Sequence, residues 1–123
     1  MQPAVAERAI LVGLELKGRP ARRPGGSPET DSTDTAGSLE ELATLSKSAG
    51  AEILGTLVQS RESPEAATLI GSGKLEELTA MALAQQADLV IFDRDLTPTQ
   101  LRNLERALPC RVIDRTQLIL DIF

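Results

Sequence analysis

Short apolar runs alternate with amphipathic stretches along this chain, as expected when strands alternate with helices. The apolar runs predict strands, and apolar residues at helical spacing predict the helices between them. Strands are expected at residues 9–16, 51–58, 68–70, 88–92 and 110–113, and helices at 38–49, 74–86 and 98–108. The alternation predicts an α/β fold: a layered, mostly parallel four- to five-stranded sheet flanked by helices.

The ends of the helices carry recognisable capping signals. Ser38 and Glu41 form a predicted capping box, as do Thr97 and Gln100, and Gly50 is suited to end the first helix. Asp114 and Gln117 are placed to cap a further helix. The residues expected to face inward are Leu39, Leu42, Ala43, Leu45, Ser46 and Ala49 in the first helix, Leu75, Leu78, Met81 and Ala82 in the second, and Leu101, Leu104, Ala107 and Leu108 in the third.

Two segments lack any hydrophobic period. Residues 1–8 are interpreted as an N-terminal tail that precedes an α/β domain over 9–123. Glycine and proline interrupt the polar stretch 17–37, which is predicted to be a flexible loop, either a solvated insertion or a functional one. The chain ends on the apolar run 118–123, so residues 114–123 are expected to begin a helical connection to a further domain.

Composition indicates a single soluble domain. The chain has 123 residues, of which 41% are hydrophobic and 25% are charged. No apolar run is long enough for a membrane span, and the N-terminus does not resemble a signal peptide. Cys110 is the only cysteine, which favours a cytoplasmic location. The net charge of −5 argues against nucleic-acid binding by bulk charge alone, although a local basic patch is compatible with it.

The residues that are missing exclude several kinds of chemistry. Without histidine and with a single cysteine, a transition-metal site is not expected, and a Ser-His-Asp triad is impossible. Phe92 and Phe123 are the only aromatic residues, so a stacking platform for single-stranded nucleic acid is not expected. The sequence therefore predicts no catalytic residue in this chain.

A glycine turn, Gly71-Ser72-Gly73-Lys74, lies between a predicted strand and a predicted helix, where backbone N–H groups attract anions. It fails the phosphate-loop pattern, because Thr68 stands where the first glycine is required and Leu75 where Ser or Thr is required. It also fails the Rossmann spacing. The turn has one of three roles. It only allows a tight connection between strand and helix, it contacts an RNA phosphate or a partner, or it binds a nucleotide.

Charged residues follow the strand at 88–92 and continue through the C-terminal half. Asp93 and Asp95 stand at a strand end, where open α/β sheets place ligands, but the acidic pair and the lysine of a receiver domain are missing, so loop hydrogen bonding is the simpler interpretation. The arginines are Arg94, Arg102, Arg106, Arg111 and Arg115. They form either a solvated face with acidic partners or a modest basic surface for an RNA backbone.

Three segments resemble one family. The sequences IGSGKLEEL at 70–78, ADLVIFDRDLTPTQLRNLE at 87–105 and VIDRTQLILDIF at 112–123 are similar to the N-terminal domain of the HflX GTPases. The resemblance implies a parallel α/β domain followed by a helical linker and a GTPase domain that lies outside this chain. It also implies cytoplasmic partners, namely the large ribosomal subunit with its rRNA and the protein's own linker and GTPase domain, in a protein that splits stalled or idle ribosomes.

From this resemblance we expect a ribosome-docking and regulatory domain that performs no catalysis itself. GTP and Mg are expected in the missing GTPase domain, and no cofactor or metal in this chain. The residues expected to face phosphate or RNA are Gly71, Ser72, Gly73, Lys74, Arg94, Arg102 and Arg115. The alternatives are an accessory ATP-binding domain that uses the turn 71–74, and a domain that only packs within its own protein.

Overall fold

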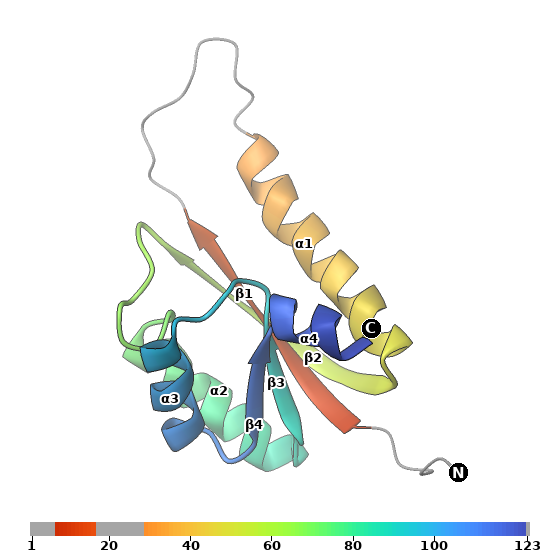
Figure 1. Cartoon of the computed structure of the whole chain (residues 1–123). Coiled ribbons are helices and arrows are strands. Elements are labelled where there is room, and N and C mark those ends of the chain that lie inside the picture. Colours follow the sequence, from red (N-terminus) through yellow and green to blue (C-terminus); the bar gives the residue numbers. More distant parts are fainter. Residues whose placement is uncertain (1–6, 17–28, 123) are drawn as a thin grey trace, which may run out of the picture.

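One parallel sheet organises the molecule. The computed structural model describes residues 7–16 and 29–122, and it contains β1 (Glu7–Leu16), β2 (Ala51–Arg61), β3 (Leu89–Phe92) and β4 (Arg111–Asp114). The strands are parallel and lie in the order β2-β1-β3-β4 (Figure 1). The predicted α/β class with a parallel sheet flanked by helices is therefore confirmed, with four strands in the described part of the chain.

The strand β1 lies inside the sheet and is its most buried element. It pairs with β2 on one side and with β3 on the other. Residues 9–14 are all buried, which explains the nearly continuous apolar run that predicted this strand. The pairing with β2 shifts after Ala9, where the partner changes from Ile53 to Gly55, so β2 carries one extra residue as a bulge.

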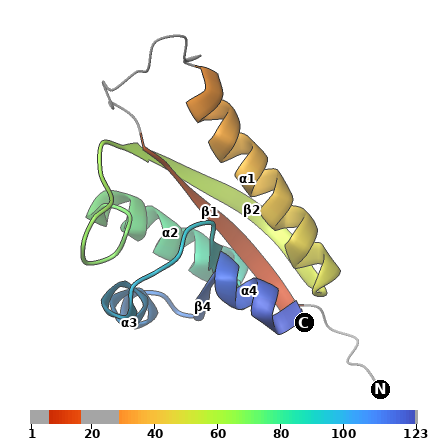
Figure 2. The ribbon, with the colours of Figure 1, turned by 45° about the horizontal axis from the view of Figure 1, so that its top comes forward.

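Four helices cover the two faces of the sheet (Figure 2). One layer consists of α1 (Glu29–Ser48) and α4 (Arg115–Ile122), and the other of α2 (Ser72–Gln85) and α3 (Pro98–Ala107). The core under α1 and α4 consists of Leu42, Leu118, Ala9, Leu11, Leu89, Ile91 and Ile113. The core under α2 and α3 is larger and includes Leu78, Ala82, Leu104, Leu108, Ile10, Val12, Leu14, Val90, Phe92 and Val112.

The start of the first helix differs from the prediction. The helix α1 begins at Glu29, so Ser38 lies inside it and the predicted capping box of Ser38 and Glu41 is wrong. Residues 29–37 of the predicted loop are helical, and residues 17–28 lie outside the described part. Gly37 suggested a boundary, but a glycine in a helix costs only about 1 kcal/mol and does not end it.

The predicted strand at residues 68–70 is also wrong. Only an isolated antiparallel bridge joins Leu69 to Glu65, and Leu69 has a left-handed φ of 70°. Leu69 and Ile70 are buried under α2 and α3, so their apolar character reflects a turn that packs into the core. A short apolar run cannot distinguish these two outcomes.

Most other boundary signals are confirmed. Thr97 and Gln100 form the predicted capping box, with both hydrogen bonds at 3.0 Å. The N–H of Gln117 donates to the Asp114 carboxylate at 2.9 Å, as predicted for the start of α4. Ala49 and Ala107 were expected to face inward, but both are exposed because each lies at the last turn of its helix or beyond it.

A testable consequence concerns the end of α2, where Gln86 adopts a left-handed conformation with φ 56°. Glycine reaches this conformation without the steric cost that a side chain brings, so Gln86→Gly should raise the free energy of unfolding by about 0.5–1 kcal/mol. The matched control is Gln85→Gly, which places glycine inside the helix and should lower that free energy by about 1 kcal/mol. Urea unfolding of the three proteins measures both changes. Equal destabilisation by the two variants would contradict the expectation.

Candidate functional site

The carboxyl edge of the sheet contains the point where the direction of strand addition reverses. From β1 the chain first adds β2 on one side and later β3 on the other, so the carboxyl ends of β1 and β3 flank a topological switch point. Open α/β sheets bind ligands in the crevice at such a point. Asp93 and Arg94 follow directly after β3 and therefore stand at this position.

Asp93 is held at the switch point by contacts to two elements. Its backbone N–H donates to the carbonyl of Val12 at 3.0 Å, and its Oδ2 atom accepts from the Ser38 hydroxyl on α1 at 3.5 Å. The Oδ1 atom is buried, and no donor among the described residues reaches it. Desolvation by this burial raises the pKa of Asp93, and the nearby charge of Arg94 lowers it in part.

Arg94 links the ends of two neighbouring strands. Its Nε atom donates to the carbonyl of Leu14 in β1 at 3.2 Å. This contact fixes the root of the guanidinium, while the residue as a whole remains exposed to solvent. Arg94 is thus a cation that the fold positions at the switch point.

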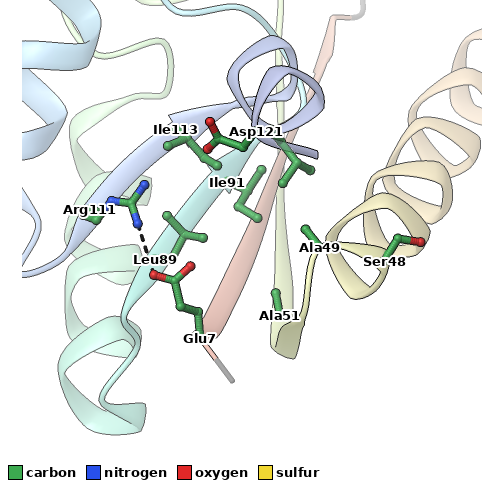
Figure 3. A pocket seen from close by; sticks show the side chains of 10 residues that line it. Glu7, Ser48, Ala49, Ala51, Leu89, Ile91, Arg111, Ile113 and Asp121 are labelled. Atoms are coloured by element: carbon green, nitrogen blue, oxygen red, sulfur yellow. Dashed lines mark hydrogen bonds and ion pairs between the residues drawn. The ribbon is translucent and has the colours of Figure 1, made fainter. Parts of the chain in front are cut away.

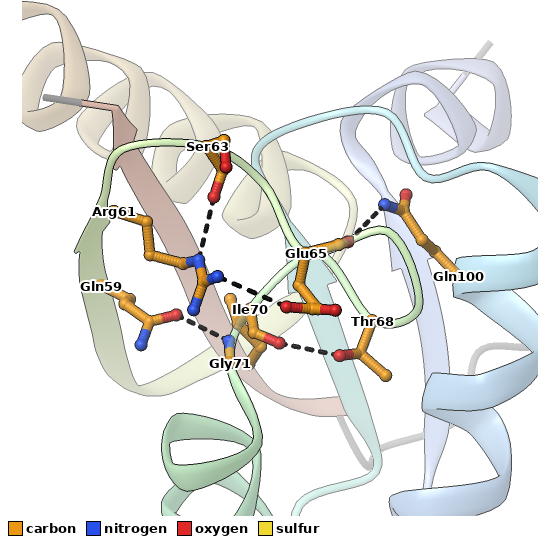
Figure 4. A network of polar contacts seen from close by, with 8 residues as sticks. All are labelled: Gln59, Arg61, Ser63, Glu65, Thr68, Ile70, Gly71 and Gln100. Atoms are coloured by element: carbon orange, nitrogen blue, oxygen red, sulfur yellow. Dashed lines mark hydrogen bonds and ion pairs between the residues drawn. The ribbon is translucent and has the colours of Figure 1, made fainter. Parts of the chain in front are cut away.

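The glycine turn lies at the start of α2, and it is packed against an arginine (Figure 4). An ideal Cβ on Gly71 would lie 2.6 Å from the Nη1 atom of Arg61, which is closer than any real contact. Arg61 is held there by the Ser63 carbonyl at 2.9 Å and by the Glu65 carboxylate at 3.3 Å. A side chain at position 71 would therefore displace the Arg61 guanidinium.

Hydrogen bonds from α3 hold the loop that precedes α2. The buried side chain of Gln100 donates to the Glu65 carbonyl at 3.0 Å, while its Oε1 atom caps α3 (Figure 4). Asn103 donates to the Ala67 carbonyl, also at 3.0 Å. Sequence reasoning missed this network, because its members were visible only as polar residues of a loop and a capping box. The single available signal was the capping role of Gln100.

The residues of the turn itself differ in what they offer to a ligand. The N–H of Gly71 already donates to the Gln59 side chain at 2.8 Å, and Lys74 is paired with Glu77 at 3.1 Å. Ser72 and Gly73 are exposed in the first turn of α2, and Gly71 provides no side-chain cap. The first turn of α2 therefore presents its backbone to solvent mainly at Ser72 and Gly73.

The remaining predicted cations lie in different layers. Arg102 is exposed on α3, in the same layer as Lys74. Arg115 lies on the opposite layer, at the start of α4, and is paired with Glu41 of α1 at 2.7 Å. Arg94 and Arg115 follow strand ends at the carboxyl edge, and Lys74 lies there in the first turn of α2. The sheet separates Lys74 from Arg115. The structure gathers these residues at one edge and does not join them into one cluster.

Two further observations limit the chemistry of this edge. Within residues 7–16 and 29–122, no group of three His, Cys, Asp or Glu side chains is arranged to hold a metal ion. In the same part of the chain, no helix combines the length and hydropathy needed to cross a bilayer. The groups at the carboxyl edge that a ligand could contact are therefore its cations, the start of α2 and Asp93.

Comparison with known proteins identifies the family. Residues 36–123 match the family described as GTP-binding GTPase N-terminal, a range that holds every described element except β1 and the start of α1. The chain belongs to this family. It is 47% identical over 117 residues to the GTPase HflX of Caldanaerobacter subterraneus subsp. tengcongensis, which covers 95% of the chain and 24% of that relative.

Two more relatives give the same result for the HflX family. The GTPase HflX of Alkalihalophilus pseudofirmus is 48% identical over 117 residues, with 95% of this chain and 25% of the relative covered. The GTPase HflX of Escherichia coli is 48% identical over 85 residues, with 69% of this chain and 20% of the relative covered. The chain thus spans about a quarter of the length of these relatives and corresponds to an HflX N-terminal domain.

The contact between Gly71 and Arg61 can be tested in the HflX-type domain. Gly71→Ala should displace the Arg61 guanidinium and lower the free energy of unfolding by about 1 kcal/mol, because the obstructing atom is the end of a flexible side chain. Gly73→Ala is the matched control, since open space surrounds its position, and it should raise that free energy by about 0.5 kcal/mol. Chemical unfolding compares the variants. A neutral Gly71→Ala variant would show that Arg61 does not constrain this turn.

The burial of Asp93 predicts a pH dependence. Because its folded pKa is raised, its contribution to stability is fully present below the ordinary value of 3.8 and is lost as the pH rises through the folded value. Asp93→Asn is neutral at every pH, so its free energy of unfolding should fall less than that of the unsubstituted chain between about pH 4 and pH 7. Urea unfolding at several pH values measures this, with exposed Asp95→Asn as control. Parallel profiles for the Asp93→Asn variant and the unsubstituted chain would refute the assignment.

Proposed function

We propose that this HflX-type domain docks on the RNA of the large ribosomal subunit and regulates a GTPase domain of the same protein. The observation that supports this most directly is the family assignment, since the matched relatives are named GTPase HflX and the chain corresponds to their N-terminal part. In this proposal the complete protein splits ribosomes, and GTP and Mg bind in its GTPase domain. The N-terminal domain contributes binding and restraint, and it performs no catalysis.

The carboxyl edge is the proposed docking surface. Arg94 and the exposed turn of Ser72 and Gly73 face solvent at strand ends, where a phosphate can approach backbone N–H groups and a positioned guanidinium. Arg102 extends this surface along α3. Phosphate contacts position a protein on RNA without reading its sequence, so a few well-placed cations suffice even in a chain with a net charge of −5.

Lys74 and Arg115 join the proposed docking surface by exchanging a carboxylate partner for an RNA phosphate. Each is paired with a carboxylate, Glu77 and Glu41 respectively, that is more than half exposed. Exposed pairs of this kind contribute about 0–1 kcal/mol, so an RNA phosphate can replace the carboxylate at little cost. The linker and the GTPase domain of the same protein are the proposed intramolecular partners. The N-terminal domain restrains them, and docking on the ribosome releases that restraint.

The alternative is an accessory ATP-binding domain that uses the turn 71–74. The geometry favours it less, because the N–H of Gly71 already donates to the Gln59 side chain and is not free for a nucleotide phosphate. Measuring ATP binding to the isolated chain distinguishes the two proposals. If ATP binding is saturable and Lys74→Ala abolishes it, the ATP site is supported. The proposal that this turn docks on RNA would then be wrong.

Co-sedimentation of the 123-residue chain with purified large ribosomal subunits across a salt titration tests the docking surface. Arg102→Glu, chosen because the residue is exposed, should weaken binding about tenfold and reduce the salt slope by about one unit. Arg94→Glu should behave similarly. Lys47→Glu is the matched control, since it reverses an exposed charge at the last turn of α1, and it should leave binding within about twofold of the unsubstituted chain. Binding that all three reversals weaken equally, or no binding at low salt, would refute the proposal.

A further inference from the structure

A cleft of about 350 Å³ opens at the amino edge of the sheet, at the opposite end from the proposed docking surface (Figure 3). It lies between the end of α1 and α4, on the face that these two helices cover. Glu7, Ala51, Leu89 and Arg111, the first residues of their strands, contribute to its lining. Its volume is at the lower end of the range of about 300–1,000 Å³ found for small-molecule sites.

The floor of the cleft is apolar and already well packed. Leu89, Ile91 and Ile113 form it, and each is at most 7% exposed. Ala49 and Ala51 line it near the connection from α1 to β2, where larger side chains would fill the space. The floor therefore offers apolar contact to an aliphatic chain.

The rim of the cleft is acidic. Glu7 and Asp121 are its carboxylates, and Arg111 is its only cation among the described residues. Arg111 pairs with Glu7 at 3.1 Å, which leaves one formal negative charge, that of Asp121. Asp121 accepts a hydrogen bond from Gln117 at 3.0 Å, and this contact orients its carboxylate without neutralising it.

Helix α1 adds to this negative character. It ends at Ser48, a lining residue, so the negative end of its dipole lies at the cleft. Lys47, the basic residue of that last turn, is not among the lining residues. These charges disfavour phosphates and other anions in the cleft and favour a cation.

We propose that this cleft binds a lysine or arginine side chain from a basic segment of a protein partner. The aliphatic stem would lie over the floor of Leu89, Ile91 and Ile113, as the stems of such side chains commonly do on apolar surfaces. The cationic group would then reach Asp121 and the end of α1. The proposal is independent of RNA docking, because it uses the opposite edge of the sheet and the opposite sign of charge.

An NMR titration of the isotope-labelled 123-residue chain with capped tri-arginine peptide tests the proposal. The backbone amides of Ala51, Leu89 and Ile113 should shift with a common binding curve. Asp121→Asn removes the charge and keeps the shape, and it should weaken binding about two- to fivefold. The matched control Glu76→Gln removes an exposed charge from α2, on the other face, and should leave binding unchanged.

Two further measurements keep the test decisive. Capped tri-norleucine carries an apolar side chain without the charge and should not bind. Ala51→Leu narrows the cleft and should block tri-arginine, provided that its amide spectrum shows a folded chain; if it does not fold, Asp121→Asn alone decides. Equal weakening by Asp121→Asn and Glu76→Gln, binding of tri-norleucine, or shifts confined to other regions would each overturn the proposal.

Discussion

The arrangement of the domain depends on the burial of β1 between two parallel neighbours and two helical layers. Residues 9–14 lose contact with water on both faces, and the backbone of residues 9–12 pairs with a strand on each side. Helix α1 approaches this strand very closely, since a Cβ on Gly13 would lie 2.9 Å from the Leu39 side chain. Parallel neighbours require crossover connections, so placing β1 inside the sheet also sets where α1 and α2 run.

The same constraint produces the switch point. Because β2 and β3 flank β1 on opposite sides, the segments that leave β1 and β3 diverge at their carboxyl ends, and the residues after β3 remain at the opening. Asp93 is buried there by β1 and by α1, which explains its raised pKa and its contact with Ser38. Ionising a carboxyl group held in this way costs folding free energy, because burial disfavours its charged form.

The sequence predicted those features that depend on neighbours along the chain. The capping box of Thr97 and Gln100 and the buried run of β1 are local patterns, and both were recognised correctly. The start of α1 was misjudged because Gly37 has only a weak effect on a helix that its surroundings support. The apolar residues at 68–70 were misjudged because a buried turn and a buried strand have the same composition.

The candidate site was less accessible to sequence reasoning, and the reason is spatial. Arg61 of β2 packs closely against Gly71, and no spacing in the sequence indicates that contact. In the same way, Lys74 and Arg115 both lie in the first turn of a helix, yet the two helices cover opposite sides of the sheet. Charge counted along the chain therefore overstated how closely these cations gather.

In the proposed function, RNA binding by this acidic domain depends on a few positioned cations and not on net charge. Cations stand at the carboxyl edge, where the fold positions Arg94, while the amino edge has an acidic cleft with the end of α1 beside it. The carboxylates that pair with Lys74 and Arg115 are exposed, so the energy lost by exchanging them for phosphates is small. The amino-edge cleft keeps a net negative charge at Asp121, so in the proposed function it does not compete for RNA phosphates.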